Sequence, residues 1–191
     1  MEQLGERISL LLLLLTIMNV SASPYPFFIV LSYAVHEVGH LFFAKITGAG
    51  VTDFKTSLCR LSIKYDCTSV SYFKESLVCG GGVIFNLAFF AIFAAPVFRN
   101  SEKLTFFSLC NLSLAIMNMY PVSVLDGGGV LRCTMYSVFK EKTAERILKL
   151  TSFAFAFILW LFAVYLQLVF SSNISMFFIS ILLLIELCFS L

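Results

Sequence analysis

Apolar positions dominate this chain and gather into long runs separated by short polar connections. A helix needs about 20 apolar residues to cross a hydrocarbon core of about 30 Å, and six runs approach that length. The runs are 8–22, 27–47, 77–98, 104–125, 150–170 and 174–191. This pattern predicts an all-α integral membrane protein with about six transmembrane helices, organised as a single domain over residues 1–191.

The first run allows two interpretations. It is short for a membrane span, and Arg7 before it with Ser21-Ala22-Ser23 at its end is also typical of a secretory signal peptide. Cleavage there would leave the second span directly at the mature amino terminus. A membrane span is therefore the favoured interpretation.

The connection between the second and third runs has a different periodicity. Apolar and polar positions alternate over residues 59–65, which indicates a half-buried strand. Residues 68–73 are also rich in strand formers. We expect a small β-hairpin here, lying against the membrane and offering an edge strand that could capture an unwound substrate segment.

Composition supports the membrane assignment. Hydrophobic residues make up 60% of the chain and charged residues 13%, whereas a soluble domain is about half apolar and about a quarter charged. The net charge of +2 is too small to suggest a nucleic-acid partner.

The basic residues predict an orientation, because Lys and Arg resist translocation. With the amino terminus in the cytosol, every one of the 13 Lys and Arg residues except Arg99 and Lys103 falls on the cytosolic side. We therefore expect a multi-pass protein of the cell membrane with both termini cytosolic. The distribution fits a bacterial inner membrane.

The only two histidines of the chain lie in the segment His36-Glu37-Val38-Gly39-His40, inside the second run. On a helix, positions i and i+4 share a face, so two neutral imidazoles there can bind one zinc ion beside a glutamate general base. Burying these groups in hydrocarbon is costly unless something compensates them, and a bound metal would do so. The alternative is a polar trio that faces a helix bundle without metal.

Catalytic zinc needs a third protein ligand and an open position for water. No further histidine exists, so the ligand must be a carboxylate or a thiolate, and the candidate acids are Asp126 and Glu186. Asp126 is favoured because the charge rule brings it to the same side as the histidines. Glu186 is expected to snorkel or to pair. Around Asp126, we expect Asn118 and Pro121 to interrupt a helix and Gly127-Gly128-Gly129 to end it.

H-E-x-x-H in an early span, followed in a later span by N-x-x-P-x-x-x-x-D-G from Asn118 to Gly127, resembles the site-2 proteases. The size and six-span layout look most like the sporulation branch, whose members process an inactive sigma-factor precursor. The resemblance implies that Asp126 is the third zinc ligand and Glu37 the catalytic base.

The resemblance extends to a third segment. The family has a glycine-rich stretch followed by asparagine, and here Gly80-Gly81-Gly82 precedes Asn86, with Val83 where proline often stands. By this resemblance Asn86 lines the active site. The alternative for the glycines is close helix packing through small residues. Asn86 or Asn118 could also hold the substrate or the oxyanion, since both are polar amides in apolar spans.

The expected function is that of an intramembrane zinc metalloendopeptidase. Its substrate would be a membrane-embedded or membrane-associated protein cut near the cytosolic face, such as a sigma-factor precursor or another regulatory protein. No PDZ or CBS domain is expected, so regulation would come from another protein, such as a second membrane protein, or be absent. A His₂Asp site usually prefers zinc, although cobalt and iron stay open.

Two alternatives remain. The first is another membrane zinc protease class, such as the prenyl-protein type, which would need Glu186 as a ligand. The second is a non-enzymatic metal-binding membrane protein, either a transporter or an inactive protease homologue. The presence of Glu37 disfavours the inactive homologue, because metal binding alone does not need it.

Overall fold

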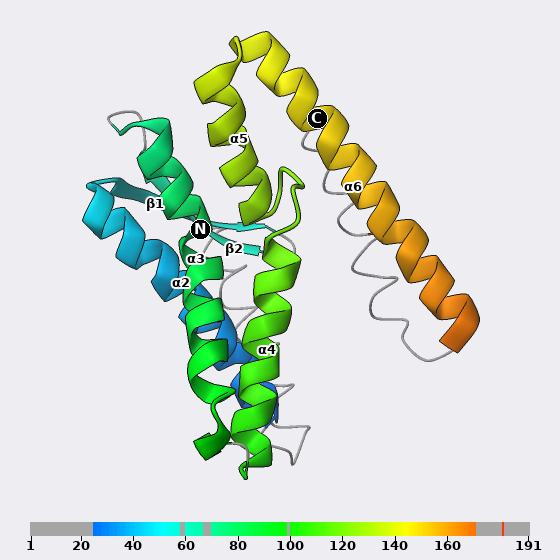
Figure 1. Cartoon of the computed structure of the whole chain (residues 1–191). Coiled ribbons are helices and arrows are strands. Elements are labelled where there is room, and N and C mark those ends of the chain that lie inside the picture. The colour runs from blue at the N-terminus through cyan, green and yellow to red at the C-terminus, as the bar shows by residue number, and fades with distance from the viewer. Residues whose placement is uncertain (1–24, 58–59, 67–69, 99, 171–180, 182–191) are drawn as a thin grey trace. The chain divides into compact units, whose positions relative to one another are not determined.

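The computed structural model of the chain describes residues 25–57, 60–66, 70–98, 100–170 and 181 (Figure 1). The predicted spans 8–22 and 174–191 therefore lie outside the described residues, apart from Ile181. The elements in chain order are α2 (Tyr25–Thr47), β1 (Gly50–Ser57), β2 (Arg60–Asp66), α3 (Tyr72–Phe93), the 3-10 helix η1 (Pro96–Phe98), α4 (Glu102–Asn118), α5 (Asp126–Val138) and α6 (Glu141–Phe170).

Three helices in the described part are long and apolar enough to cross a membrane. They are Tyr25–Thr47, Tyr72–Phe93 and Glu141–Tyr165, and they overlap three of the predicted spans. Length and composition together support a membrane protein, whereas the total of six spans stays a prediction.

The predicted span 104–125 needs correction. Helix α4 ends at Asn118, and after an irregular segment a new helix, α5, begins at Asp126. The expectation that Gly127-Gly128-Gly129 ends a helix was wrong, because these glycines form the first turn of α5. A side chain at Gly128 would collide with the backbone of Val122, so a tertiary contact explains the glycine there.

The chain divides into two compact units, which are described separately. Unit 1 contains Met1–Ser71 and Gly81–Ala115, and unit 2 contains Tyr72–Gly80 and Ile116–Leu191.

In unit 1, α2 packs with α4 and with the part of α3 that begins at Gly81 (Figure 1). Asn111 of α4 donates a hydrogen bond to the Ser32 hydroxyl of α2 at 3.1 Å. Aromatic rings fill the space around Phe107, which lies 5.2 Å from Phe93 and 5.8 Å from Phe28 between ring centroids. Unit 1 therefore has a mostly apolar core with a buried polar link.

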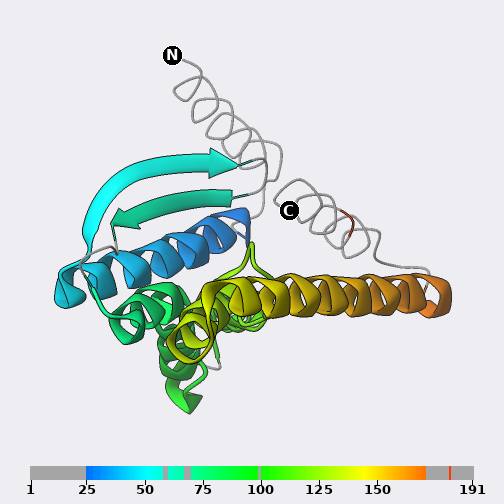
Figure 2. The same cartoon turned by 90° about the horizontal axis from the view of Figure 1, so that it is seen from above.

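The two strands of unit 1 pair antiparallel, from Gly50 opposite Asp66 to Ser57 opposite Arg60. The register is irregular between Val51 and Asp53. Seen from above, the paired strands lie along α2 (Figure 2).

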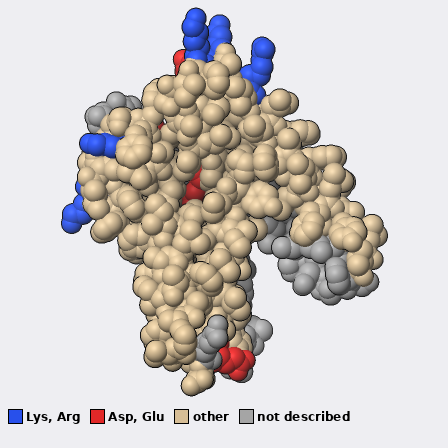
Figure 3. Space-filling view, in the orientation of Figure 1, with Lys and Arg blue, Asp and Glu red and all other residues tan. Residues whose placement is uncertain are grey.

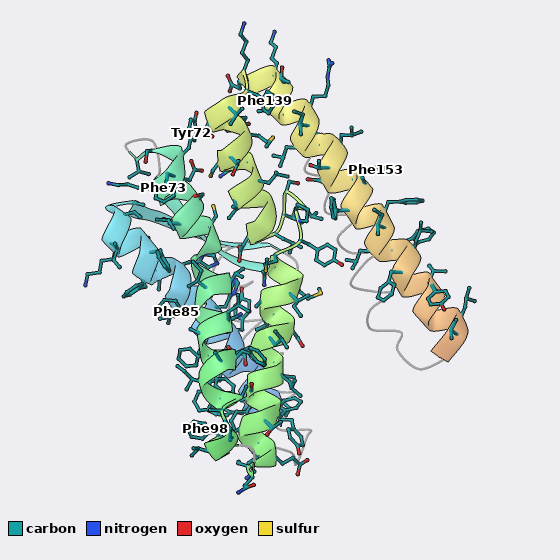
Figure 4. All side chains as sticks on the ribbon, viewed as in Figure 1. Tyr72, Phe73, Phe85, Phe98, Phe139 and Phe153 are labelled. Atoms are coloured by element: carbon teal, nitrogen blue, oxygen red, sulfur yellow. The ribbon has the colours of Figure 1, made fainter. Side chains whose placement is uncertain are left out.

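In unit 2, the irregular segment before α5 packs on α6. The Ser123 backbone N–H donates to the Ser152 hydroxyl at 2.9 Å, and Val122 and Ala156 are fully buried beside it. Exposed basic residues gather at the junction of α5 and α6 (Figure 3): Lys140, Lys142, Arg146 and Lys149. Apolar side chains such as Phe153 are exposed along α6 (Figure 4), as expected of a surface that faces lipid.

Candidate metal centre

The histidine pair lies on the buried face of α2. His36 is 4% exposed and His40 is 8% exposed. Because they are four residues apart on one helix, their rings point the same way, and their Nε2 atoms lie 3.2 Å apart. The Nε2 atom of each ring therefore points to the same place.

This spacing fits a zinc ion. Two imidazole nitrogens at about 2.0–2.1 Å from a tetrahedral ion lie about 3.3 Å from each other. The Nε2 atoms of His36 and His40 are 3.2 Å apart. The pair is thus arranged as two neighbouring ligands of a tetrahedral metal.

Glycines on the facing part of α3 make room for the two rings. A Cβ added at Gly82 would lie 2.5 Å from Cε1 of His36 and 2.6 Å from Nε2 of His40. One residue earlier, a Cβ at Gly81 would lie 2.7 Å from the carbonyl oxygen of Gly39. The two helix backbones approach closely at this crossing, as small residues allow.

Asn86 lies one helical turn beyond Gly82 and is fully buried. Its Nδ2 atom is 3.1 Å from Nδ1 of His36. Its Oδ1 atom is buried and has no hydrogen-bond partner among the described residues. The amide therefore contacts Nδ1 of His36, whereas the other ring nitrogen, Nε2, is the one close to Nε2 of His40.

The other predicted site residues have different surroundings. Glu37 is half-buried on α2, directly after His36 and three residues before His40. Asp126 belongs to unit 2, where it is the first residue of α5 and 4% exposed. A carboxylate in the first turn is favoured by the helix dipole. Asn118 is half-buried at the end of α4, and Glu186 lies outside the described residues.

By residue type, His36, His40 and Asp126 are a set that could hold a metal ion, and all three are buried. Two imidazoles and one carboxylate are a ligand set found in catalytic zinc sites that keep a position for water.

Comparison with known proteins agrees with this chemistry. Residues 90–162 match the model of peptidase family M50. A Chlamydia pneumoniae protein provisionally named a zinc metalloprotease is 33% identical over 66 residues, which are 35% of this chain and 11% of that protein. The site-2 protease from Methanocaldococcus jannaschii has a similar structure, with a TM-score of 0.67 and 20% identity, over 92% of this chain and 83% of that one.

These comparisons relate residues 90–162 to peptidase family M50 by sequence. The structural likeness shows the site-2 protease fold over most of the chain, so the fold expected from the resemblance is supported. The family-model match includes Asn118 and Asp126, whereas the histidine pair lies before it. None of these three comparisons distinguishes the sporulation branch from the rest of the site-2 protease family.

Sequence reasoning did not find the contact between Asn86 and His36. The sequence contains part of the information, since Gly82 and Asn86 are four residues apart and so share one face of α3. Which residue that face meets depends on the crossing of α2 and α3, and the sequence spacing within one helix carries no information about it.

Proposed function

We propose that this chain is an intramembrane zinc metalloprotease that hydrolyses peptide bonds in or near the membrane. The observation that carries the proposal is the buried histidine pair, whose Nε2 atoms have the spacing of two ligands of one tetrahedral ion. The supported family and the provisional name of the Chlamydia pneumoniae relative agree with it.

In this proposal, His36 and His40 bind the metal through Nε2, and Asp126 supplies the third ligand from α5. A zinc ion bound there would lower the pKa of a bound water towards neutrality and polarise the scissile carbonyl. Glu37 accepts the proton of the attacking water and returns it to the leaving amine. Its place beside both histidines on α2 suits that role.

The proposed substrate is a membrane-embedded or membrane-associated regulatory protein, such as a sigma-factor precursor, cut near the cytosolic face. We propose a multi-pass arrangement in a bacterial inner membrane with cytosolic termini. The distribution of Lys and Arg and the exposed apolar side chains of α2, α3 and α6 support it. A second membrane protein is the proposed regulator.

The test is co-expression of the chain with tagged membrane-associated candidates, including sigma-factor precursors. The variant is Glu37→Gln, and the matched control is Glu145→Gln, which changes an exposed glutamate of α6 in the same way. We expect cleavage to be lost only in Glu37→Gln, with one zinc bound per chain in all three proteins. Equal cleavage by Glu37→Gln would refute the role of Glu37. Absence of both cleavage and bound zinc would favour a non-enzymatic membrane protein.

A further inference from the structure

Asn86 is a buried polar side chain that has no role in the chemistry proposed above. It belongs to an apolar helix and is fully buried. Burial of an amide costs free energy unless its hydrogen bonds are made. Only one of its two polar atoms has a described contact, to Nδ1 of His36 at 3.1 Å, while the buried Oδ1 has none among the described residues.

The direction of this hydrogen bond decides whether His36 can bind metal. A neutral imidazole carries one proton, on either Nδ1 or Nε2. If Asn86 donates to Nδ1, the proton of His36 must be on Nε2, and Nε2 cannot then bind a metal. If Asn86 accepts from an Nδ1–H, Nε2 keeps its lone pair. Since Nε2 is the atom that faces His40 at 3.2 Å, only the second direction allows both histidines to bind one ion.

The amide group can supply the required acceptor without moving its backbone. The oxygen and nitrogen of an asparagine amide exchange places when the group turns by 180° about its last side-chain bond. Turned in this way, Oδ1 accepts the Nδ1–H of His36. In that orientation Oδ1 takes the place beside His36 that Nδ2 holds in the structure, and Nδ2 takes the place of Oδ1.

We infer that Asn86 is a positioning residue that accepts a hydrogen bond from Nδ1–H of His36 through its amide oxygen and thereby keeps Nε2 free for the metal. The inference rests on the proposed function. Hydrogen bonds of this kind fix the tautomer and the ring orientation of metal-binding histidines, and their loss typically costs 10–100-fold in metal affinity.

Three variants of the full-length chain in detergent test this role, with zinc affinity measured by competition with a chelator. Asn86→Asp keeps an acceptor and removes the donor, and Asn86→Leu removes both at similar volume. Asn111→Leu is the matched control, since Asn111 is equally buried but hydrogen-bonds to Ser32 and not to a histidine. We expect a loss of about 10–100-fold in Asn86→Leu, wild-type affinity within a few-fold in Asn86→Asp, and unchanged affinity in Asn111→Leu.

A second readout follows the proton itself. With only two histidines in the chain, ¹⁵N-histidine labelling reports the tautomers of His36 and His40 in the zinc-loaded protein. We expect a protonated Nδ1 on His36 in wild type and in Asn86→Asp, and a loss or shift of that signal in Asn86→Leu. A role limited to helix packing would not move it.

The outcomes separate this inference from the proposed function. Wild-type zinc affinity in a folded Asn86→Leu would overturn the role of Asn86 and leave the protease intact. An equal loss in Asn86→Asp and Asn86→Leu would also overturn it, because the donor would then be the group that matters. If Asn86→Leu does not fold, the affinity of Asn86→Asp decides. Failure of the wild-type chain to bind zinc would overturn the proposed function and this inference with it.

Discussion

The chain contains two runs of three glycines, Gly80-Gly81-Gly82 and Gly127-Gly128-Gly129, and the structure uses them differently. The first lies in the interior of α3, where Gly82 faces the imidazole rings of His36 and His40. The second forms the first turn of α5, where Gly128 faces the backbone of Val122. The same sequence thus makes room for side chains in one helix and for main chain at the start of another.

In both runs, the atoms that a glycine faces matter more than the low helix propensity of glycine. By propensity alone, three glycines weaken a helix interior by about 0.5–1 kcal/mol each. Both runs are nevertheless helical, and in each run one glycine lies where an added Cβ would overlap neighbouring atoms. The alanine variants below replace one hydrogen with a methyl group and so measure what each glycine faces.

The largest effect is expected at Gly82. Its added Cβ would lie 2.5–2.7 Å from atoms of both histidine rings, so Gly82→Ala must push the rings out of alignment. We expect zinc affinity, measured by chelator competition, to fall about 100-fold, at the upper end of what disturbed ligand support costs. Unchanged zinc affinity in a folded Gly82→Ala protein would show that the rings adjust freely. Gly82 would then not be needed to make room for the histidine side chains, and the contrast with Gly128 would be lost.

The next effect is expected at Gly128, and it is one of stability. The added Cβ would collide with the carbonyl group of Val122, which belongs to the backbone and cannot rotate away. Overpacking of this kind usually costs about 1–3 kcal/mol. We expect Gly128→Ala to lower the thermal midpoint in detergent more than Gly82→Ala does. A midpoint equal to that of wild type would mean that the segment before α5 can shift at little cost.

Features that depend on a single helix could be predicted from the sequence. Contacts between two crossing helices could not. The spacing of His36 and His40 is enough to place both rings on one face, since a helix fixes that geometry within one turn. The sequence also places the helix break at Asn118 and Pro121, and α4 does end at Asn118.

The first turn of α5 differs from the sequence prediction for a related reason. Glycine is a common stop signal after a helix, so the run after Asp126 predicts an end when it is considered alone. The structure starts a helix there instead, and Val122 lies against Gly128, where only a residue without Cβ fits. The surroundings of these glycines in the fold therefore outweigh their local signal to end a helix.

A smaller effect is expected at Gly129, which also allows a rescue. Its added Cβ would lie 2.9 Å from Sγ and 3.2 Å from Cβ of Cys79. Gly129→Ala should therefore cost less than Gly128→Ala, because a thiol can turn aside where a backbone carbonyl cannot. Removing the thiol with Cys79→Ala should recover part of the loss, so that the two changes are not additive in thermal stability. Strict additivity would indicate that the thiol does not limit the space at Gly129.

The smallest effect, and one of opposite sign, is expected at Gly80. The nearest atom to its added Cβ is Cγ2 of Val130 at 3.7 Å, an ordinary van der Waals contact. Because alanine has the better helix propensity, Gly80→Ala should raise the stability of the folded chain by up to about 1 kcal/mol. Zinc affinity should stay at the wild-type value. Gly80→Ala and Gly82→Ala make the same chemical change two residues apart in α3, so opposite results would assign the effect at Gly82 to the histidine rings. A loss of zinc affinity in Gly80→Ala similar to that in Gly82→Ala would instead assign both effects to the helix as a whole.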